Sequence, residues 1–150
     1  MTRLEDHLES KKFFAPSQYG FHSRRSTAGA AIKLKKVAKK AITDKRFCTA
    51  VGLNIRNAFN LIPWEKIMEG LRKARVPTYL IRMINGYLSN QCIMADSSGG
   101  IVKSPVTCGV PQESVLGLTL WDVAFNGIIR LELPPEVQLI CYADDTLVVA

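Results

Sequence analysis

The sequence predicts a mixed domain of helices and strands, of the α/β or α+β class. Short apolar segments typical of strands alternate along the chain with longer segments of helical periodicity. The composition, 47% hydrophobic and 22% charged, is that of a globular protein with enough apolar side chains for one core. The 150 residues contain no internal repeat, low-complexity tract or linker, so we expect a single unit.

The first predicted helix is amphipathic and basic, and a strand follows it. Ser26 is a suitable N-cap, and small or apolar residues recur at helical spacing from there to about Asp44. Segment 47–55 is apolar without helical periodicity, which predicts a strand buried on both faces, with Asn54 at its C-terminal end. The positions between the apolar residues of the helix carry Lys33, Lys35, Lys36, Lys39 and Lys40.

Two further helices and a hairpin occupy the middle of the chain. Pro63 and Pro77 each stand at the start of a helix, where proline is well tolerated. Segments 91–95 and 101–106 flank the turn residues 97–100, which predicts two short paired strands. The apolar stripes of the two helices are formed by Trp64, Ile67, Met68 and Leu71, and by Leu80, Ile81, Ile84, Tyr87 and Leu88.

A buried helix and a second hairpin complete the prediction. Residues 114–130 are apolar enough for a helix that packs on several sides. Segments 137–142 and 146–149 are apolar strands on either side of Ala143-Asp144-Asp145. The second hairpin therefore carries two adjacent carboxylates at its tip.

The charge and cysteine content indicate which kinds of partner the chain could bind and in which cellular compartment it is expected. Lys and Arg number 20 against 13 Asp and Glu, and the basic residues concentrate in the first half of the chain. Such a surface fits either a nucleic-acid partner or plain solvation. Without a signal peptide or a long apolar run, the chain is expected to be soluble and intracellular, with no membrane partner. Its cysteines, Cys48, Cys92, Cys108 and Cys141, are expected to be reduced and mostly buried.

The paired carboxylates of Asp144 and Asp145 have two interpretations. Aspartate is common in turns, so the pair is compatible with an ordinary hairpin turn. Carboxylates are also the protein ligands that Mg²⁺ takes together with substrate phosphates. The pair alone leaves both interpretations open.

Four segments in order resemble the reverse transcriptase (RNA-directed DNA polymerase) domain of non-LTR retrotransposons. They read QYGFHSRRST, LNIRNAF, GVPQESVLG and CYADDTLVV, and the resemblance runs from about Leu4 to Ala150. It implies a right-hand polymerase fold with a ferredoxin-like or RRM-like palm sheet. Residues 1–46 would belong to the fingers and 47–150 to the palm, with an inserted fingers-like hairpin at 91–106 and the thumb absent.

The resemblance also implies a catalytic metal site. Asp144 matches a family metal ligand, and Asp145 matches a nearby supporting carboxylate. The strand motif of the family ends in an aspartate that shares this site, and here that position is Asn54. Asn54 and Asp144 are therefore expected to share one cluster, in which Mg²⁺ binding and nucleotidyl transfer are weakened because an amide carries no charge.

Four positions match the family's nucleotide site. Phe59 corresponds to an aromatic steric gate for deoxynucleotides, Gln112 lies beside the incoming nucleotide, and Ile55 follows the degenerate metal position. Arg25 is expected near the triphosphate or the template backbone, because a guanidinium suits phosphate. The chain departs from the family pattern at His22, Arg24, Glu113 and Leu118.

Three functions remain open from the sequence. The first is a reverse transcriptase fragment, acting on an RNA template, a DNA primer and deoxynucleoside triphosphates, with impaired catalysis. The second is a noncatalytic nucleic-acid-binding module derived from the same fold, which Asn54 and Glu113 fit equally well. The third is an unrelated α/β domain with a fortuitous aspartate pair, which the absence of the second hairpin would favour.

Overall fold

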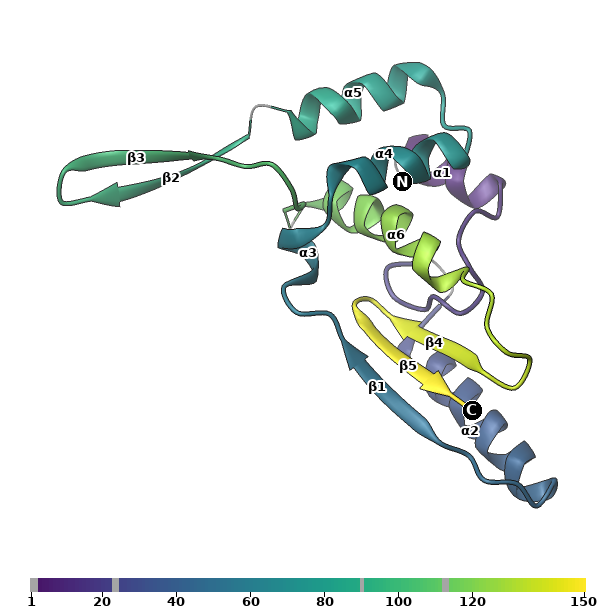
Figure 1. The fold of residues 1–150 in the computed structure, drawn as a ribbon. Helices are drawn as coiled ribbons and strands as arrows, with labels where there is room; N and C mark the ends of the chain where they lie inside the picture. Colours follow the sequence, from purple (N-terminus) through teal and green to yellow (C-terminus); the bar gives the residue numbers. More distant parts are fainter. Residues whose placement is uncertain (1–2, 23–24, 90, 112–113) are drawn as a thin grey trace. The chain divides into compact units, whose positions relative to one another are not determined.

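The computed structural model describes residues 3–22, 25–89, 91–111 and 114–150 and has a mixed helix and sheet fold with antiparallel sheets (Figure 1). This confirms the predicted fold class in its broad form. Its elements in order are α1 (Arg3–Ser10), α2 (Thr27–Thr43), β1 (Ala50–Asn54), α3 (Ala58–Leu61), α4 (Trp64–Lys73), α5 (Thr78–Leu88), β2 (Cys92–Ser97), β3 (Gly100–Pro105), α6 (Val115–Ile129), β4 (Gln138–Tyr142) and β5 (Asp145–Val149).

The chain forms two compact units, each built from two separate stretches of sequence. Met1–Phe13 and Asn57–Ala124 make up the first, which we call the helical unit. Phe14–Arg56 and Phe125–Ala150 make up the second, the sheet unit. Because the last boundary falls inside α6, no change of composition or linker marks the division, and the sequence alone suggested a single unit.

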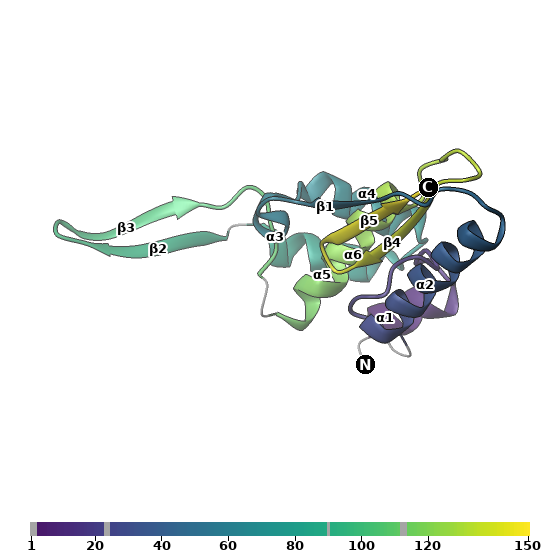
Figure 2. The ribbon, with the colours of Figure 1, turned by 90° about the horizontal axis from the view of Figure 1, so that it is seen from below.

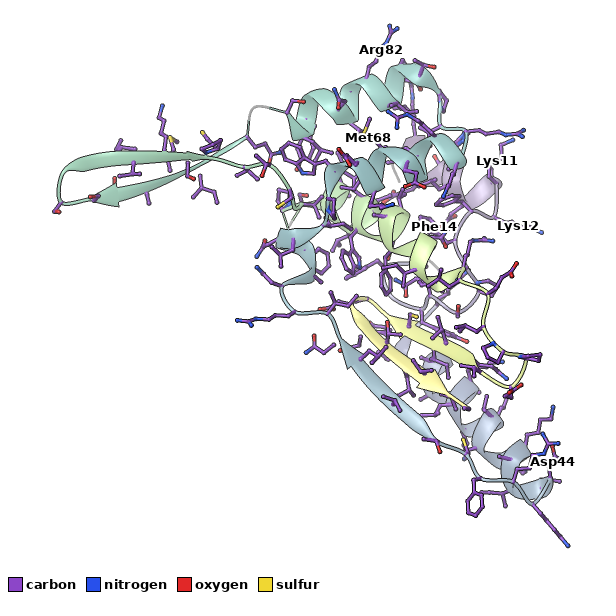
Figure 3. The ribbon with its side chains drawn as sticks, in the orientation of Figure 1. Lys11, Lys12, Phe14, Asp44, Met68 and Arg82 are labelled. Atoms are coloured by element: carbon purple, nitrogen blue, oxygen red, sulfur yellow. The ribbon has the colours of Figure 1, made fainter. Side chains whose placement is uncertain are left out.

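The sheet unit is a three-stranded antiparallel sheet with α2 against one face (Figure 2). The strand order is β1-β5-β4, so the strand from the middle of the chain joins the C-terminal hairpin. Ser26 caps α2 through a hydrogen bond from the Gly29 amide, and Asp44 ends the helix as predicted (Figure 3). The hairpin β4–β5 confirms the predicted C-terminal strands.

The prediction for β1 is wrong in burial. The strand spans Ala50–Asn54, shorter than the expected 47–55, and all five residues are exposed. Val51 and Leu53 each remain 50% exposed, and Phe47 is 99% exposed. An apolar run indicates a strand but does not reveal that the strand lies at a sheet edge, with a hydrogen-bonded neighbour on one side only.

The helical unit buries the predicted stripe of α4. Ile67 and Leu71 are fully buried and Met68 nearly so, while Trp64 at the start of the helix is half-buried. In α5 the stripe is buried at Ile84 and Leu88 but reaches solvent at Tyr87, and Arg82 projects away from α4 (Figure 3). The sequence missed α1, whose Leu4 and Leu8 lie one turn apart in the core, and the single turn of α3.

The hairpin β2–β3 extends away from the helices of its own unit, and every residue of both strands is exposed (Figure 1). Its turn is tighter than predicted, since Ser97 already pairs with Gly100. Side chains alternate between the two faces of such a ribbon. Both faces therefore carry exposed apolar groups, which are Ile93, Met94, Ile101 and Val102.

Cysteine burial also differs from expectation. All four thiols are free, but Cys48 and Cys92 are exposed, Cys108 is intermediate and only Cys141 is buried. Burial raises the pKa of the Cys141 thiol because the thiolate loses solvation. Among the residues that the structure describes, no helix has the length and apolarity required to cross a membrane.

Candidate active site

The acidic turn of the sheet unit is tighter than the sequence indicated. Tyr142 pairs with Asp145 across the β4–β5 hairpin, so Ala143 and Asp144 form the turn and Asp145 is the first residue of β5. Ala143 adopts a left-handed backbone with φ of 55°. Asp144 is half-buried and Asp145 is exposed. The two adjacent carboxylates therefore occupy different kinds of position, one in the turn and one in the strand.

Asn54 lies directly opposite Asp145 in the β1–β5 ladder. Directly opposite residues of an antiparallel pair point to the same face, with Cβ atoms about 5 Å apart. Since Tyr142 pairs with Asp145 from the other side, Asn54, Asp145 and Tyr142 form one row across the sheet. The predicted pairing of the strand motif with the acidic hairpin is confirmed, and the register partner of Asn54 is Asp145. Asp144 lies in the adjoining turn, and its expected sharing of one cluster with Asn54 stays a prediction.

A pocket of about 500 Å³ opens beside this row within the sheet unit. Asn54, Tyr142 and Asp145 line it together with residues of the first half of α2. The rest of its wall is largely apolar and is formed by Ala30, Ala31, Leu34, Gly52, Leu53, Ile140, Thr146 and Leu147. The polar groups of the row are therefore open to a ligand that enters between α2 and the sheet.

The side-chain oxygens of Asn54, Asp144 and Asp145 have no protein partner among the residues that the structure describes. The same part of the chain holds no group of three or more His, Cys, Asp or Glu side chains that could hold a metal ion. Position 54 contributes a neutral amide beside Asp145 instead of a further carboxylate.

The predicted gate residue lies in the core of the helical unit. Phe59 is 8% exposed, and its ring packs on Trp121 with centroids 5.0 Å apart and planes tilted by 33°. Its backbone carbonyl accepts a hydrogen bond from the Val110 amide at 2.8 Å. The structure thus places Phe59 beside the loop that leads towards Gln112, and the gate role stays a prediction.

That loop is pinned to α3 and the start of α4 by hydrogen bonds. The Gly109 amide donates to the Ile62 carbonyl at 2.8 Å, and the Trp64 indole donates to the Gly109 carbonyl at 2.8 Å. Gly109 has a φ of 86°, and a Cβ built there would lie 2.5 Å from the Asn60 carbonyl oxygen. The glycine of the GVPQ motif is thus required by both backbone conformation and space.

Comparison with known proteins agrees with these motifs. The family model described as "Reverse transcriptase (RNA-dependent DNA polymerase)" matches residues 1–150, the whole chain. The chain belongs to the reverse transcriptase family. It is 26% identical over 150 residues to a probable RNA-directed DNA polymerase from transposon BS of Drosophila melanogaster. It is 28% identical over 156 residues to the RNA-directed DNA polymerase from mobile element jockey of the same species.

These alignments cover nearly all of this chain but a small part of the relatives. They include 96% and 99% of the chain, and only 16% and 17% of the two Drosophila proteins. A third relative, a putative 115 kDa protein in the type-1 retrotransposable element R1DM, is 27% identical over 130 residues. The reverse transcriptase relatives are therefore proteins of non-LTR retrotransposons, and this chain spans about a sixth of the first two.

Arg25 of this reverse transcriptase chain is engaged with backbone. Its Nη1 donates to the Ala15 carbonyl at 2.7 Å and also to the Gln18 carbonyl, so it ties the QYGF segment to its own loop. His22, a departure from the family pattern, packs its ring on Phe14 with centroids 4.4 Å apart. The predicted contact of Arg25 with phosphate stays a prediction, and the structural contacts of this side chain were not foreseen.

The structure describes some of the remaining residues that the sequence analysis singled out, and others lie outside the described residues. Ile55 is half-buried directly after β1, and Leu118 is half-buried in α6. Gln112 and Glu113 lie outside the described residues, as does Arg24. The sequence analysis singled out the QYGF motif but assigned no role to Gln18, Tyr19 or Gly20, which lie along β4. The QYGF motif was the sequence feature that could have pointed to these residues, but only the fold shows what they contact.

Proposed function

We propose that this chain is the fingers and palm part of a non-LTR retrotransposon reverse transcriptase, which in its intact relatives copies RNA into DNA. The placement of Asn54 opposite Asp145, next to the Asp144 turn, is the observation that carries this proposal. Fingers at 1–46, palm at 47–150 and an inserted hairpin at 91–106 are the division that we propose. A ferredoxin-like or RRM-like palm sheet is part of the same proposal.

Asp144 and Asp145 would hold divalent metal in this site, with the Asn54 carbonyl as a neutral third oxygen donor. Such oxygens suit Mg²⁺, which prefers hard ligands and keeps several waters. When bound there, divalent metal ions would supply activation of the primer 3′-hydroxyl and stabilisation of the charge on the transferred phosphoryl group. Asp144 and Asp145 supply the negative charge that retains them, whereas Asn54 supplies none.

The missing charge at position 54 is expected to reduce catalysis strongly. If the lost ligand removes ~4 kcal/mol of transition-state stabilisation, the rate falls by about a thousandfold. We therefore propose that catalysis by this copy is impaired while its fold is retained.

The substrates that we propose follow from the family. They are an RNA template, a DNA primer and deoxynucleoside triphosphates. Phe59, Gln112, Ile55 and Arg25 are the proposed nucleotide-site residues. Of these, Phe59 lies in the helical unit beside the Gly109–Pro111 loop.

Manganese binding tests the metal site directly. Mn²⁺ shares the oxygen preference of Mg²⁺ and broadens the NMR signals of nearby residues. We expect weak, selective broadening at Asp144 and Asp145 in this chain, and at least about a tenfold gain in Mn²⁺ affinity in Asn54→Asp, because affinity rises with ligand charge.

Asp144→Ala in the Asn54→Asp background is the control and should remove the selective broadening. Gly86→Ala, in open space on α5 of the helical unit, should leave it unchanged. Broadening that is spread over other carboxylates, and is insensitive to both Asn54→Asp and Asp144→Ala, would exclude a metal site at this turn.

A noncatalytic nucleic-acid-binding role is the second candidate, and the outer face of α2 favours it. Leu34, Val37 and Ala38 are half-buried on one side of this helix. At about 100° per residue, Lys36 and Lys39 fall on the opposite side, and Lys33, Lys35 and Lys40 fall on the two flanks. All five are exposed and none has an ion-pair partner within the described residues. We name Lys33, Lys35, Lys36, Lys39 and Lys40 the α2 lysine ridge.

The α2 lysine ridge predicts salt-dependent binding of single-stranded RNA. Each phosphate that a lysine neutralises releases condensed counterion. For single strands, each such contact steepens the fall of log affinity with log salt concentration by about 0.7. The double variant Lys35→Gln, Lys39→Gln is therefore expected to lower that slope by about 1.4 and to weaken binding at low salt. Fluorescence anisotropy of a labelled RNA oligonucleotide across a salt series measures both quantities.

Lys66→Gln with Lys73→Gln gives a control of equal charge change. These two exposed lysines of α4 both pair with Glu69, at 3.0 and 2.7 Å. Their hydrogen bonds and charges lower the pKa of Glu69 to about 2. Equal losses of RNA affinity in the two double variants would show that net charge, and not the α2 lysine ridge, governs binding.

A further inference from the structure

Residues 17–20 lie along the edge of β4 in the sheet unit. The Tyr19 amide donates to the Cys141 carbonyl at 2.7 Å, and the Cys141 amide donates to the Ser17 carbonyl at 2.8 Å. Between these bonds, Gln18 forms a parallel bridge with Cys141. The segment thus adds a short strand-like pairing to the strand that leads into the acidic turn.

The same segment contacts the turn itself at Ala143. A Cβ built on Gly20 would lie 2.2 Å from the Ala143 nitrogen and 2.9 Å from its Cα, so only glycine fits against this backbone. Gln18, which is 1% exposed, donates from its Nε2 to the Ala143 carbonyl at 3.5 Å. The peptide group before Ala143 therefore lies close against Gly20, and the one after it accepts a hydrogen bond from Gln18.

Ala143 is the residue of the turn that most requires such support. Its φ of 55° is a left-handed conformation that costs free energy for an L-amino acid with a side chain. Residues in sparsely populated backbone regions persist when the surrounding structure fixes them. The backbone conformation at Ala143 determines the position of the Asp144 backbone. A change in that conformation would therefore move the Asp144 carboxylate.

Arg25 locks the supporting segment to its own loop. Its Nη1 donates to the carbonyls of Ala15 and Gln18, on either side of Ser17. Ala15 is fixed in turn, because its amide donates to Oδ1 of Asn126 at 2.8 Å in a buried position. A single guanidinium nitrogen thus restrains the curvature of the loop that lies on β4.

We propose that residues 17–20, locked by Arg25, form a brace that positions the Ala143–Asp144 turn and so the carboxylates of Asp144 and Asp145. Gly20 and Arg25 are positioning residues, which act on the carboxylates through the backbone of Ala143. The consequence for metal binding rests on the proposed function, whereas the brace itself does not.

Hydrogen exchange of this chain tests the brace without any metal. In Arg25→Met the amides of Tyr19 and Cys141, which form the two bridging bonds, should exchange at least about tenfold faster, because local opening becomes easier. Arg25→Lys, which keeps one charged donor, should exchange at an intermediate rate. Gly86→Ala, in open space on α5 of the helical unit, should match the unchanged chain. Unchanged exchange in both Arg25→Met and Gly20→Ala would overturn the brace.

Mn²⁺ titration in the Asn54→Asp background then tests positioning. Gly20→Ala and Arg25→Met should each weaken Mn²⁺ binding at Asp144 and Asp145 by at least about tenfold, with Gly86→Ala unchanged. If Gly20→Ala unfolds the sheet unit, Arg25→Met, which inserts no atom against Ala143, gives the result. Faster exchange in Arg25→Met with unchanged Mn²⁺ affinity would overturn the positioning role. If no Mn²⁺ binding is lost in Asp144→Ala, the proposed metal function is refuted. The hydrogen-exchange result still tests the brace in that case.

Discussion

Asn54→Asp is expected to raise primer extension at least about a hundredfold in a polypeptide that continues past Ala150 with the matching segment of a longer relative. The physical reason is the charge at the row of Asn54, Asp145 and Tyr142, where the substitution places a carboxylate directly opposite Asp145. An added anionic ligand stabilises bound metal and the charge that develops in phosphoryl transfer, and several kcal/mol correspond to a hundredfold or more. Extension of a labelled primer on an RNA template, with Mg²⁺ and deoxynucleotides, measures the gain.

Three controls separate this effect from others. The present chain, with or without Asn54→Asp, is expected to show no detectable extension, because its relatives are about six times longer and we propose that the duplex is gripped elsewhere. Asp144→Ala should abolish the regained activity. Glu113→Gly tests whether the second departure from the family also limits turnover. An extended polypeptide that polymerises well with Asn54 in place would refute this residue as the disabling change.

The helices and hairpins that the sequence predicted share strong local patterns. α4 was readable because Ile67, Met68 and Leu71 repeat at helical spacing and all become buried. The β4–β5 hairpin was readable because apolar strands flank a polar turn, and its pairing with β1 followed from the family resemblance. The existence and order of these elements were therefore set by short-range chemistry.

The features that were missed depend on contacts between distant segments. The exposure of β1 follows from its edge position, which no local pattern records. Asn54 was expected to share a cluster with Asp144, and the sequence did not show that its register partner is Asp145, because the register of β1 against β5 depends on pairing between segments far apart in the chain. Arg25 offered the chemistry of a phosphate ligand, and only the fold shows that two carbonyls engage it.

Gly109→Ala is expected to destabilise the helical unit by about 2–4 kcal/mol, a large effect for one methyl group. Two costs add at this position. The φ of 86° is unfavourable for any residue with a Cβ, and that Cβ would lie 2.5 Å from the Asn60 carbonyl oxygen. The loop must move to relieve this clash. That movement would break the hydrogen bond from the Gly109 amide to the Ile62 carbonyl and the one from the Trp64 indole to the Gly109 carbonyl.

Tryptophan fluorescence during urea or thermal unfolding measures this loss of stability in the helical unit. The chain has only two tryptophans, Trp64 and Trp121, and both belong to the helical unit. At about 2–4 °C per kcal/mol for a protein of this size, the midpoint should fall by roughly 5–15 °C. Gly86→Ala in α5, where nothing lies within 4 Å, is the matched control and should be neutral or stabilising by up to about 1 kcal/mol. Equal midpoints for Gly109→Ala and Gly86→Ala would mean that the GVPQ loop is not pinned to α3, and the proposed placement of Phe59 beside the nucleotide loop would fall with it.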